Sequence, residues 1–240
     1  MKYLCDPEVI PTIVPGDIAA ITSYAAHCAA FASWLHIDIA DGAFAPNSTW
    51  PYALPGQESE LGNFRATVQL PHTLALEAHL MVSEPLSLGE ALARAGFARI
   101  AGHLEAFTDA KEALRALDMW RGAGARDVGL ALKLQTSLES LAEVVGQCDF
   151  VLLMAIAEIG SQGKSFDERV ISRIEELHAA HPDMMVAVDG GVSEATIETL
   201  VRAGANRMSV GSAISKSADP AGTYMQILER AQRGCMPLVA

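Results

Sequence analysis

Short apolar runs alternate with longer amphipathic segments along nearly the whole chain. The short runs suit buried strands, and the longer segments, with apolar residues at helical spacing, suit helices packed on a core. Strands are expected over residues 9–14, 34–39, 76–82, 99–103, 128–132, 150–154, 185–188 and 207–210. Helices are expected over residues 17–32, 85–95, 108–121, 137–145, 167–180, 194–203 and 221–233, with a short one near 61–68 in an irregular stretch, 46–71.

Strands separated by helices pair in parallel, which places the chain in the α/β class. Eight such units in 240 residues match the size of a (β/α)8 TIM barrel. The competing fold is an open doubly wound sheet, but the G-x-G-x-x-G pattern typical of that fold does not follow the first strand. We see no linker, repeat or low-complexity segment, so we predict a single barrel domain over residues 1–240.

Polar residues gather at the ends of three expected strands. His36 and Asp38 are two positions apart and point to the same side of their strand, His79 lies in the next strand, and Asp189 comes at the end of the seventh. In a barrel these ends meet at one face, where two imidazoles and two carboxylates suit a divalent metal. Taken singly, His79 could be a core histidine and Asp189 a helix cap, but burying two carboxylates together is costly without a cation or a shared proton.

Other residues near these strand ends are open to two interpretations. Gly190-Gly191 and Gly211-Ser212 follow strands seven and eight, where barrel enzymes often bind phosphate, although such glycines also serve tight turns. Lys133 and Lys164 could add positive charge or lie on the solvated surface. His103 and Glu105 are expected to support the core or surround the site.

These motifs together resemble the ribulose-phosphate 3-epimerase family of (β/α)8 barrels, the ribulose-phosphate-binding type. The family pattern H-x-D-x-M-D-G-x-F-x-P-N is matched from His36 to Asn47, and its H-L-M by His79-Leu80-Met81. Its D-G-G-V and G-S-A-I are matched from Asp189 and from Gly211, and its P-S-I-L by Pro11-Thr12-Ile13-Val14. The order and spacing hold over nearly the whole chain.

The resemblance implies an isomerase, a ketose-phosphate 3-epimerase acting on ribulose 5-phosphate, xylulose 5-phosphate or a related pentulose or hexulose phosphate. It implies one divalent ion (Zn, Fe, Mn or Co) held by His36, Asp38, His79 and Asp189. Asp38 and Asp189 would also be the catalytic acid and base, and the ion would stabilise the enediolate between the two proton transfers. The expected substrate-binding residues are Thr12, Met81, Met154, Gly160, Gly163, Gly190, Gly191, Gly211 and Ser212.

The chain departs from the family pattern at three places. Ala40 stands where the family has a methionine near the reacting carbons, which predicts extra space beside the metal and a preferred substrate other than ribulose 5-phosphate. The loop over residues 157–166 lacks the family's proline and paired glycines, and Lys133-Leu134 replaces Asn-Pro after strand five. We therefore expect the metal end of the site to be intact and the substrate-tail end to be altered.

The composition limits the kinds of partner that the protein is expected to bind. Lys and Arg number 17 against 29 Asp and Glu, so 17 − 29 gives a net charge of −12, which disfavours nucleic acid and anionic membranes. The four cysteines show no C-x-x-C spacing and no secretory signal is seen, so we expect reduced thiols and a cytoplasmic protein. No apolar run is long enough to span a membrane. We also expect a homo-oligomer that binds a small sugar phosphate.

Two other functions fit the same residues. The same metal and enediolate chemistry could serve an aldolase or lyase on a sugar phosphate, which would release two products. A sugar-phosphate-binding protein without turnover is the other alternative, although binding alone does not require a carboxylate on each face of the ligand.

Overall fold

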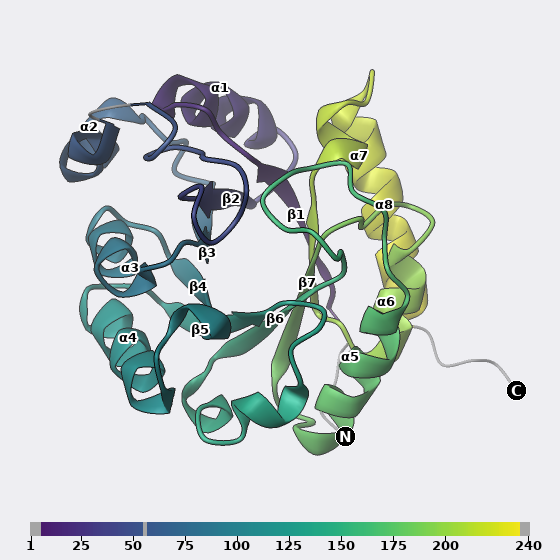
Figure 1. Cartoon of the computed structure of the whole chain (residues 1–240). Coiled ribbons are helices and arrows are strands. Elements are labelled where there is room, and N and C mark those ends of the chain that lie inside the picture. Colours follow the sequence, from purple (N-terminus) through teal and green to yellow (C-terminus); the bar gives the residue numbers. More distant parts are fainter. Residues whose placement is uncertain (1–5, 55–56, 236–240) are drawn as a thin grey trace, which may run out of the picture.

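Eight parallel strands close into a barrel in chain order, β1 to β8, with β8 pairing back to β1 (Figure 1). The computed structural model describes residues 6–54 and 57–235. The strands are β1 Glu8–Ile13, β2 Trp34–Ala40, β3 Ala75–Met81, β4 Arg99–His103, β5 Asp127–Leu132, β6 Phe150–Met154, β7 Met185–Asp189 and β8 Arg207–Val210. The predicted α/β barrel is confirmed, because the strand-helix alternation left parallel pairing as the way to bury every apolar run.

Helices form an outer ring around the barrel (Figure 1). They are α1 Ile18–Cys28, α2 Phe64–Thr67, α3 Pro85–Arg94, α4 Ala110–Gly122, α5 Arg169–Ala180, α6 Ile197–Ala203, α7 Ser212–Ser215 and α8 Pro220–Gly234. Asp17 caps α1 as expected, its carboxylate accepting a hydrogen bond from the amide of Ala20 at 2.7 Å.

One predicted helix is wrong. Residues 137–145 form two short 3₁₀ helices, Leu138–Leu141 and Val145–Gln147, instead of one α-helix. The hydroxyl of Ser140 donates to the carbonyl of Ser137 at 2.7 Å, a local hydrogen bond that competes with the backbone bonds of an α-helix. Two turns with buried Leu141 and Val145 cover the strands there equally well.

The strand alternation divides the core into two parts. Side chains pointing outward, such as Leu35, Ile37 and Ile39 of β2, pack against the helices. Side chains pointing inward fill the barrel, and they include the small Ala101, Ala131 and Ala187 beside the larger Leu152. Small residues inside the barrel leave its carboxyl end room for the polar side chains of β2, β3 and β7.

The cysteines differ partly from expectation. Cys28 and Cys148 are free thiols, as predicted. Cys235 is disulfide-bonded, so the prediction of reduced thiols is wrong at this position, and Cys5 lies outside the described residues. Spacing along the chain could not show this, because a disulfide depends on which cysteine the fold brings near. Among the described helices, none has the length and apolar character needed to cross a membrane.

Candidate metal centre

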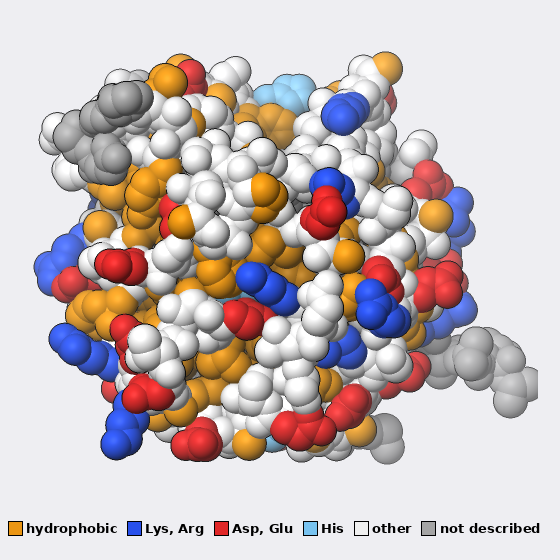
Figure 2. Space-filling model, viewed as in Figure 1, with side chains coloured by type: hydrophobic (Ala, Val, Ile, Leu, Met, Phe, Trp, Pro, Cys, Tyr) orange, Lys and Arg blue, Asp and Glu red, His pale blue; other side chains and the backbone are white. Residues whose placement is uncertain are grey.

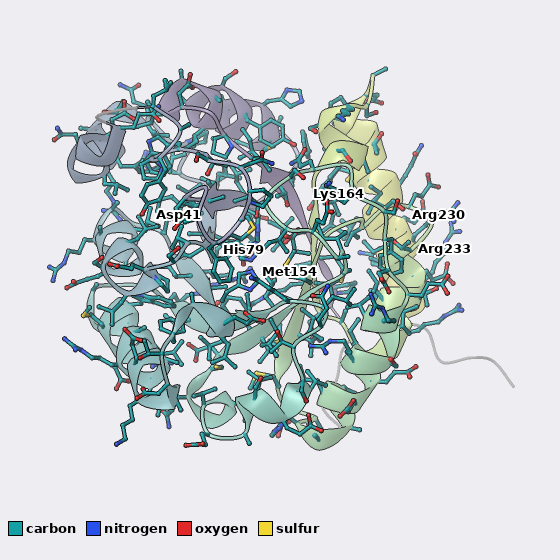
Figure 3. All side chains as sticks on the ribbon, in the orientation of Figure 1. Asp41, His79, Met154, Lys164, Arg230 and Arg233 are labelled. Carbon is teal, nitrogen blue, oxygen red and sulfur yellow. The ribbon has the colours of Figure 1, made fainter. Side chains whose placement is uncertain are left out.

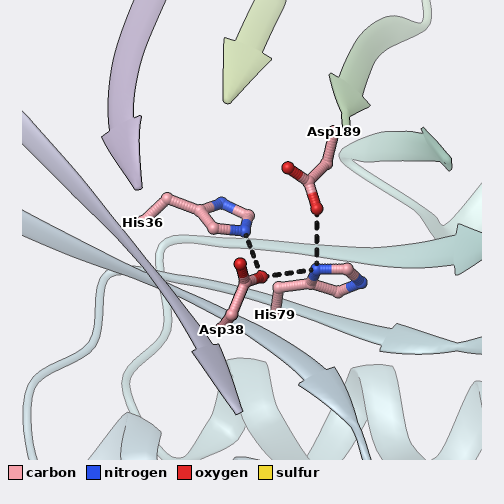
Figure 4. A group of neighbouring side chains, drawn as sticks. All are labelled: His36, Asp38, His79 and Asp189. Atoms are coloured by element: carbon pink, nitrogen blue, oxygen red, sulfur yellow. Dashed lines mark hydrogen bonds and ion pairs between the residues drawn. The ribbon is translucent and has the colours of Figure 1, made fainter. Parts of the chain in front are cut away.

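Two imidazoles and two carboxylates meet at the carboxyl end of the barrel (Figure 4). His36 and Asp38 share the inward face of β2, His79 lies opposite Asp38 on β3, and Asp189 is the last residue of β7. All four are buried, and one ligand atom from each lies within 4.8 Å of the others. The convergence predicted from the sequence is present in the fold.

Asp38 is the central group of the cluster. Its Oδ1 lies 3.1 Å from Nε2 of His36 and 3.0 Å from Nδ1 of His79, and Oδ2 of Asp189 lies 3.4 Å from the same Nδ1. Both histidines thus converge on one oxygen of Asp38, and Asp189 joins them through His79. The nitrogen and oxygen donors fit a divalent ion such as Zn, Fe, Mn or Co, and such an ion would offset the two buried carboxylates.

The electrostatics of the cluster favour positive charge between the carboxylates. Burial by itself would lower the pKa of His36 and of His79, but their hydrogen bonds to neighbouring carboxylates outweigh it, and both pKa values are raised. Burial would likewise raise the pKa of Asp38, but the bonds from both histidines hold it well below its usual value. Protonated imidazoles and a divalent ion therefore compete for the same place.

Each histidine has a further partner behind it. Nδ1 of His36 lies 2.6 Å from Oε1 of Glu77, and Nε2 of His79 lies 3.0 Å from Nε2 of His103. Nδ1 of His103 in turn lies 3.0 Å from Oε2 of Glu105. Burial is the main reason that the pKa of His103 falls to about 4, so this ring is neutral near pH 7. His103 therefore contacts His79 of the cluster and Glu105 contacts His103, as expected for residues that support the site.

Sequence reasoning missed Glu77. The signal was present, because Glu77 stands two residues before His79 and so must face the barrel interior with it. A carboxylate on the inward face of a buried strand requires a partner, and His36 is that partner.

A cavity of about 280 Å³ opens directly above the cluster. Asp38 and Asp189 line it, and so do all nine residues predicted to bind substrate: Thr12, Met81, Met154, Gly160, Gly163, Gly190, Gly191, Gly211 and Ser212. His79 and Met154 lie near the middle of the barrel mouth and Lys164 lies nearer its rim (Figure 3). On this face many charged side chains lie toward the margin of the molecule, and a few positive and negative ones lie near its middle (Figure 2).

Three lysines near the mouth differ in position. Lys164 and Lys216 line the cavity, and Nζ of Lys164 lies 2.5 Å from Oε2 of Glu158. Lys133 is not among the lining residues; its Nζ lies 3.7 Å from the centre of the Phe44 ring. Lys216 was missed because nothing in the sequence ties the end of the short helix α7 to the loop after β6.

The glycines after β7 are required by the backbone as well as by the cavity. Gly190 and Gly191 have φ values of 104° and 65°, a region that other residues rarely adopt. A Cβ on Gly191 would lie 2.8 Å from the amide nitrogen of Phe166. The turn interpretation is therefore correct for this pair, and the same turn exposes backbone to the cavity.

The altered loop after β6 packs against the far side of the cavity. Nε2 of Gln162 donates to the carbonyl of Thr12 at 2.9 Å, and Nδ2 of Asn47 donates to the carbonyl of Gly160 at 3.1 Å. These bonds join the loop to β1 and to the loop after β2. The altered loop is thus held over the cavity by these two bonds.

The structure corrects the expectation about Ala40. Its side chain is fully buried and is not among the residues that line the cavity. It belongs to an apolar cluster with Ala45, Met81 and Ile159. Ala40 therefore packs against apolar side chains and does not border the cavity, so it does not enlarge the space in which a substrate would bind.

Fold and site together define a class: a (β/α)8 barrel with a buried cluster of two histidines and two aspartates, suited to a divalent ion, beneath a cavity at the carboxyl ends of its strands. The model of the ribulose-phosphate 3-epimerase family matches residues 8–215, so the chain belongs to this family. Membership places the chain among the isomerases that epimerise carbohydrates.

Named relatives agree with this assignment. The chain is 33% identical to ribulose-phosphate 3-epimerase of Mycobacterium leprae, covering 94% of this chain and 95% of that protein. It is 30% identical to the cytoplasmic isoform of that enzyme from Oryza sativa, covering 95% of each.

The solved structures that resemble this chain share its fold, and at these low identities they indicate nothing beyond the fold. A KGPDC from Streptococcus mutans matches with a TM-score of 0.70 at 12% identity, covering 95% of this chain and 98% of that one. A 3-hexulose-6-phosphate synthase from Salmonella typhimurium matches with a TM-score of 0.68 at 14% identity, covering 95% of this chain and 99% of that one.

Proposed function

We propose that the protein is a metal-dependent ketose-phosphate 3-epimerase, with ribulose 5-phosphate and xylulose 5-phosphate as the first substrates to test. One observation carries the proposal: Asp38 and Asp189 line the same cavity from β2 and β7, which stand three strands apart around the barrel. Two carboxylates reaching one space from different sides can each address one face of a bound sugar.

Asp38 and Asp189 carry the proton chemistry in this proposal. One carboxylate removes the proton on carbon 3, and the electron pair of the broken bond forms the enediolate with carbon 2 and its oxygen. The carboxyl group on the other side, which enters the cycle protonated, then delivers its proton to the opposite face of carbon 3. His36, Asp38, His79 and Asp189 would hold a divalent ion, which would supply positive charge to the enediolate oxygens.

The phosphate end of the substrate would lie over the glycine turns after β7 and β8. Gly190, Gly191, Gly211 and Ser212 line that part of the cavity together with the side chain of Lys216. Backbone amides at such turns bind anions, and a lysine adds a point charge against the overall negative charge of the chain. Met81 and Met154 lie on the apolar part of the cavity wall.

We further propose a cytoplasmic protein with one domain over residues 1–240 that assembles as a homo-oligomer. The barrel supports a single domain, because closing it uses residues from Glu8 to Val210. A relative named as a cytoplasmic isoform supports the location. Catalysis is favoured over simple binding, because a binding protein has no need to keep both carboxylates.

The test is proton exchange at carbon 3. The protein is incubated with ribulose 5-phosphate in deuterated water with Mn²⁺, and the products are analysed by NMR. We expect xylulose 5-phosphate carrying deuterium at carbon 3. Two shorter products would show aldol cleavage instead, and unlabelled, unconverted sugar across a set of pentulose and hexulose phosphates would reject the proposal.

A further inference from the structure

Glu77 is a buried carboxylate that contacts the candidate metal centre without being one of its four ligand-type residues. It is 1% exposed and lies opposite His36 in the pairing of β2 with β3. Its Oε1 is 2.6 Å from Nδ1 of His36, whose ring is fully buried. A charged hydrogen bond of this length in an interior is a strong interaction.

The geometry fixes which nitrogen of His36 is available to an ion. Nε2 points to the centre of the cluster, 3.1 Å from Oδ1 of Asp38, and Nδ1 points to Glu77. An imidazole that offers the lone pair of Nε2 must carry its proton on Nδ1, where it can only donate. A carboxylate at Nδ1 accepts that proton's hydrogen bond and so selects the metal-binding tautomer. Oγ of Ser209, 3.1 Å from the same Nδ1, is a second acceptor.

The carboxylate of Glu77 forms an ion pair with Arg99 on the side away from His36. Nη1 of Arg99 lies 3.7 Å from Oε2 of Glu77, an oxygen that has no hydrogen-bond partner among the described residues. The guanidinium of Arg99 stacks 3.5 Å above the Trp34 ring. Arg99 is therefore fixed in place and restrains Glu77 without neutralising it through a direct hydrogen bond.

Glu77 belongs to an ionic layer at the amino-terminal end of the barrel. The layer also contains Glu8, Arg99, Asp127 and Arg207, and each arginine bonds both Glu8 and Asp127. Arg126 adds a third guanidinium, 3.1 Å from Oδ2 of Asp127. Glu8 and Asp127 take the direct hydrogen bonds of Arg99 and Arg207, so the hydrogen-bond partner left for Glu77 among the described residues is His36.

We propose that Glu77 is a positioning residue of the metal centre, which holds the His36 ring in its metal-binding tautomer and strengthens the retention of a divalent ion. This inference rests on the proposed metal centre. It makes the ionic layer part of the functional site as well as of the barrel core.

The experiment compares Zn²⁺ affinity, measured by competition with a chromophoric chelator and without any sugar. Glu77→Gln keeps the shape and an oxygen acceptor but removes the charge, and we expect the Kd for Zn²⁺ to rise about 10- to 100-fold. Asp127→Asn is the matched control, because it removes a carboxylate from the same layer that does not touch His36. We expect it to lower the Tm while keeping the Kd within about threefold of wild type.

Activity supplies a second readout. At limiting Zn²⁺ the Glu77→Gln protein should have a lowered kcat, and saturating Zn²⁺ should restore most of it with the KM for the sugar unchanged. If Glu77→Gln fails to fold, Glu77→Asp carries the test, because it keeps the charge but withdraws the carboxylate by one methylene; its Kd should rise at least about fivefold.

An unchanged Kd in the folded Glu77 variant would overturn the inference, and so would an equal rise in Asp127→Asn, which would trace the effect to loss of stability. These results leave the proposed function standing. If the wild-type protein itself binds no divalent ion, the metal centre and this inference both fail, so the two failures are distinguishable.

Discussion

At the scale of single residues, His79 links the elements of the candidate centre. Its Nδ1 lies near both Asp38 and Asp189, and its Nε2 meets His103, so one side chain on β3 connects groups on β2, β4 and β7. Replacing His79 would remove the imidazole that lies near both buried carboxylates, Asp38 and Asp189.

His79→Ala should therefore lose its divalent ion. We expect the purified variant to contain less than about a tenth of the metal per chain found in the wild type, because removing one of four ligands weakens binding by orders of magnitude. Elemental analysis after equal exposure to Zn²⁺ measures this. His178→Ala is the control, because His178 lies on the outer helix α5. Equal metal content in His79→Ala and wild type would reject the ligand assignment.

Asp189→Asn tests the proton chemistry separately from binding. An amide cannot carry the proton, so we expect kcat to fall by about three powers of ten or more. Since an amide oxygen can still coordinate, part of the metal should remain, and kcat is compared at equal metal content. Activity within about tenfold of wild type would refute the two-carboxylate mechanism.

At the scale of elements, the loop between β6 and α5 is one of the three places where this chain departs from the family pattern. Its hydrogen bonds run to β1 and to the loop after β2, through Gln162 and Asn47. The side chain of Gln162 also lines the cavity near Gly211. The loop is therefore tied down at its cavity side.

Gln162→Ala should raise the KM for the ketose phosphate about 3- to 10-fold while kcat changes by less than about threefold. The reason is that one lost hydrogen bond costs about 1 kcal/mol and acts far from carbon 3. Gln135→Ala is the control, since exposed Gln135 contacts the same loop at the carbonyl of Ala157 but does not line the cavity. If Gln162→Ala changed kcat and left KM unchanged, the loop would be inferred to act at the reacting carbons instead.

The packing around Ala40 corrects the inference that was drawn from comparing this position with the family pattern. Because its side chain is fully buried in an apolar cluster, Ala40→Met should overpack the barrel interior and lower the free energy of unfolding by about 1–3 kcal/mol. Urea unfolding measures this. A variant that is as stable as wild type and prefers a different sugar would restore the original interpretation, in which this position borders the substrate.

At the scale of the whole molecule, the two ends of the barrel interior are both charged. The carboxyl end has the cluster of two histidines and two aspartates, and the amino end has the ionic layer around Arg99 and Arg207. The two groups meet through Glu77, whose Oε1 lies 2.6 Å from Nδ1 of His36, while apolar side chains fill the interior beside them.

The ionic layer should make stability fall in acid. Burial would raise the pKa of Asp127, but hydrogen bonds from Arg126 and Arg99 lower it below its usual value. A carboxyl whose pKa is lower in the folded than in the unfolded state adds stability above the unfolded value, about 4, and this is lost as pH falls through the folded value. The difference in free energy of unfolding between wild type and Asp127→Asn should therefore shrink toward zero below about pH 4.

Urea titrations from pH 7 to pH 3 measure this difference, with Asp118→Asn as the exposed control, which should follow wild type throughout. If the difference in free energy of unfolding between wild type and Asp127→Asn stayed constant at all pH values, Asp127 would be shown to act through packing and not through its charge.

The sequence by itself determined the fold class and the four cluster residues. Period-2 and period-3.6 patterns are local, and parallel strands alternating with helices leave few ways to close a sheet. The strand-end rule then placed His36, Asp38, His79 and Asp189 at one face of the barrel. Each of these inferences needed only the order of residues and the direction of each strand.

Only the tertiary structure decided what lies beside those residues. The burial of Ala40, the approach of Lys216 to the cavity and the Glu77–His36 bond all depend on contacts between segments far apart in the chain. Such contacts depend on strand register and on the packing of neighbouring side chains, which a periodic pattern does not encode. The order of residues along the chain therefore specified which residues converge, and side-chain packing specified which groups each of them contacts.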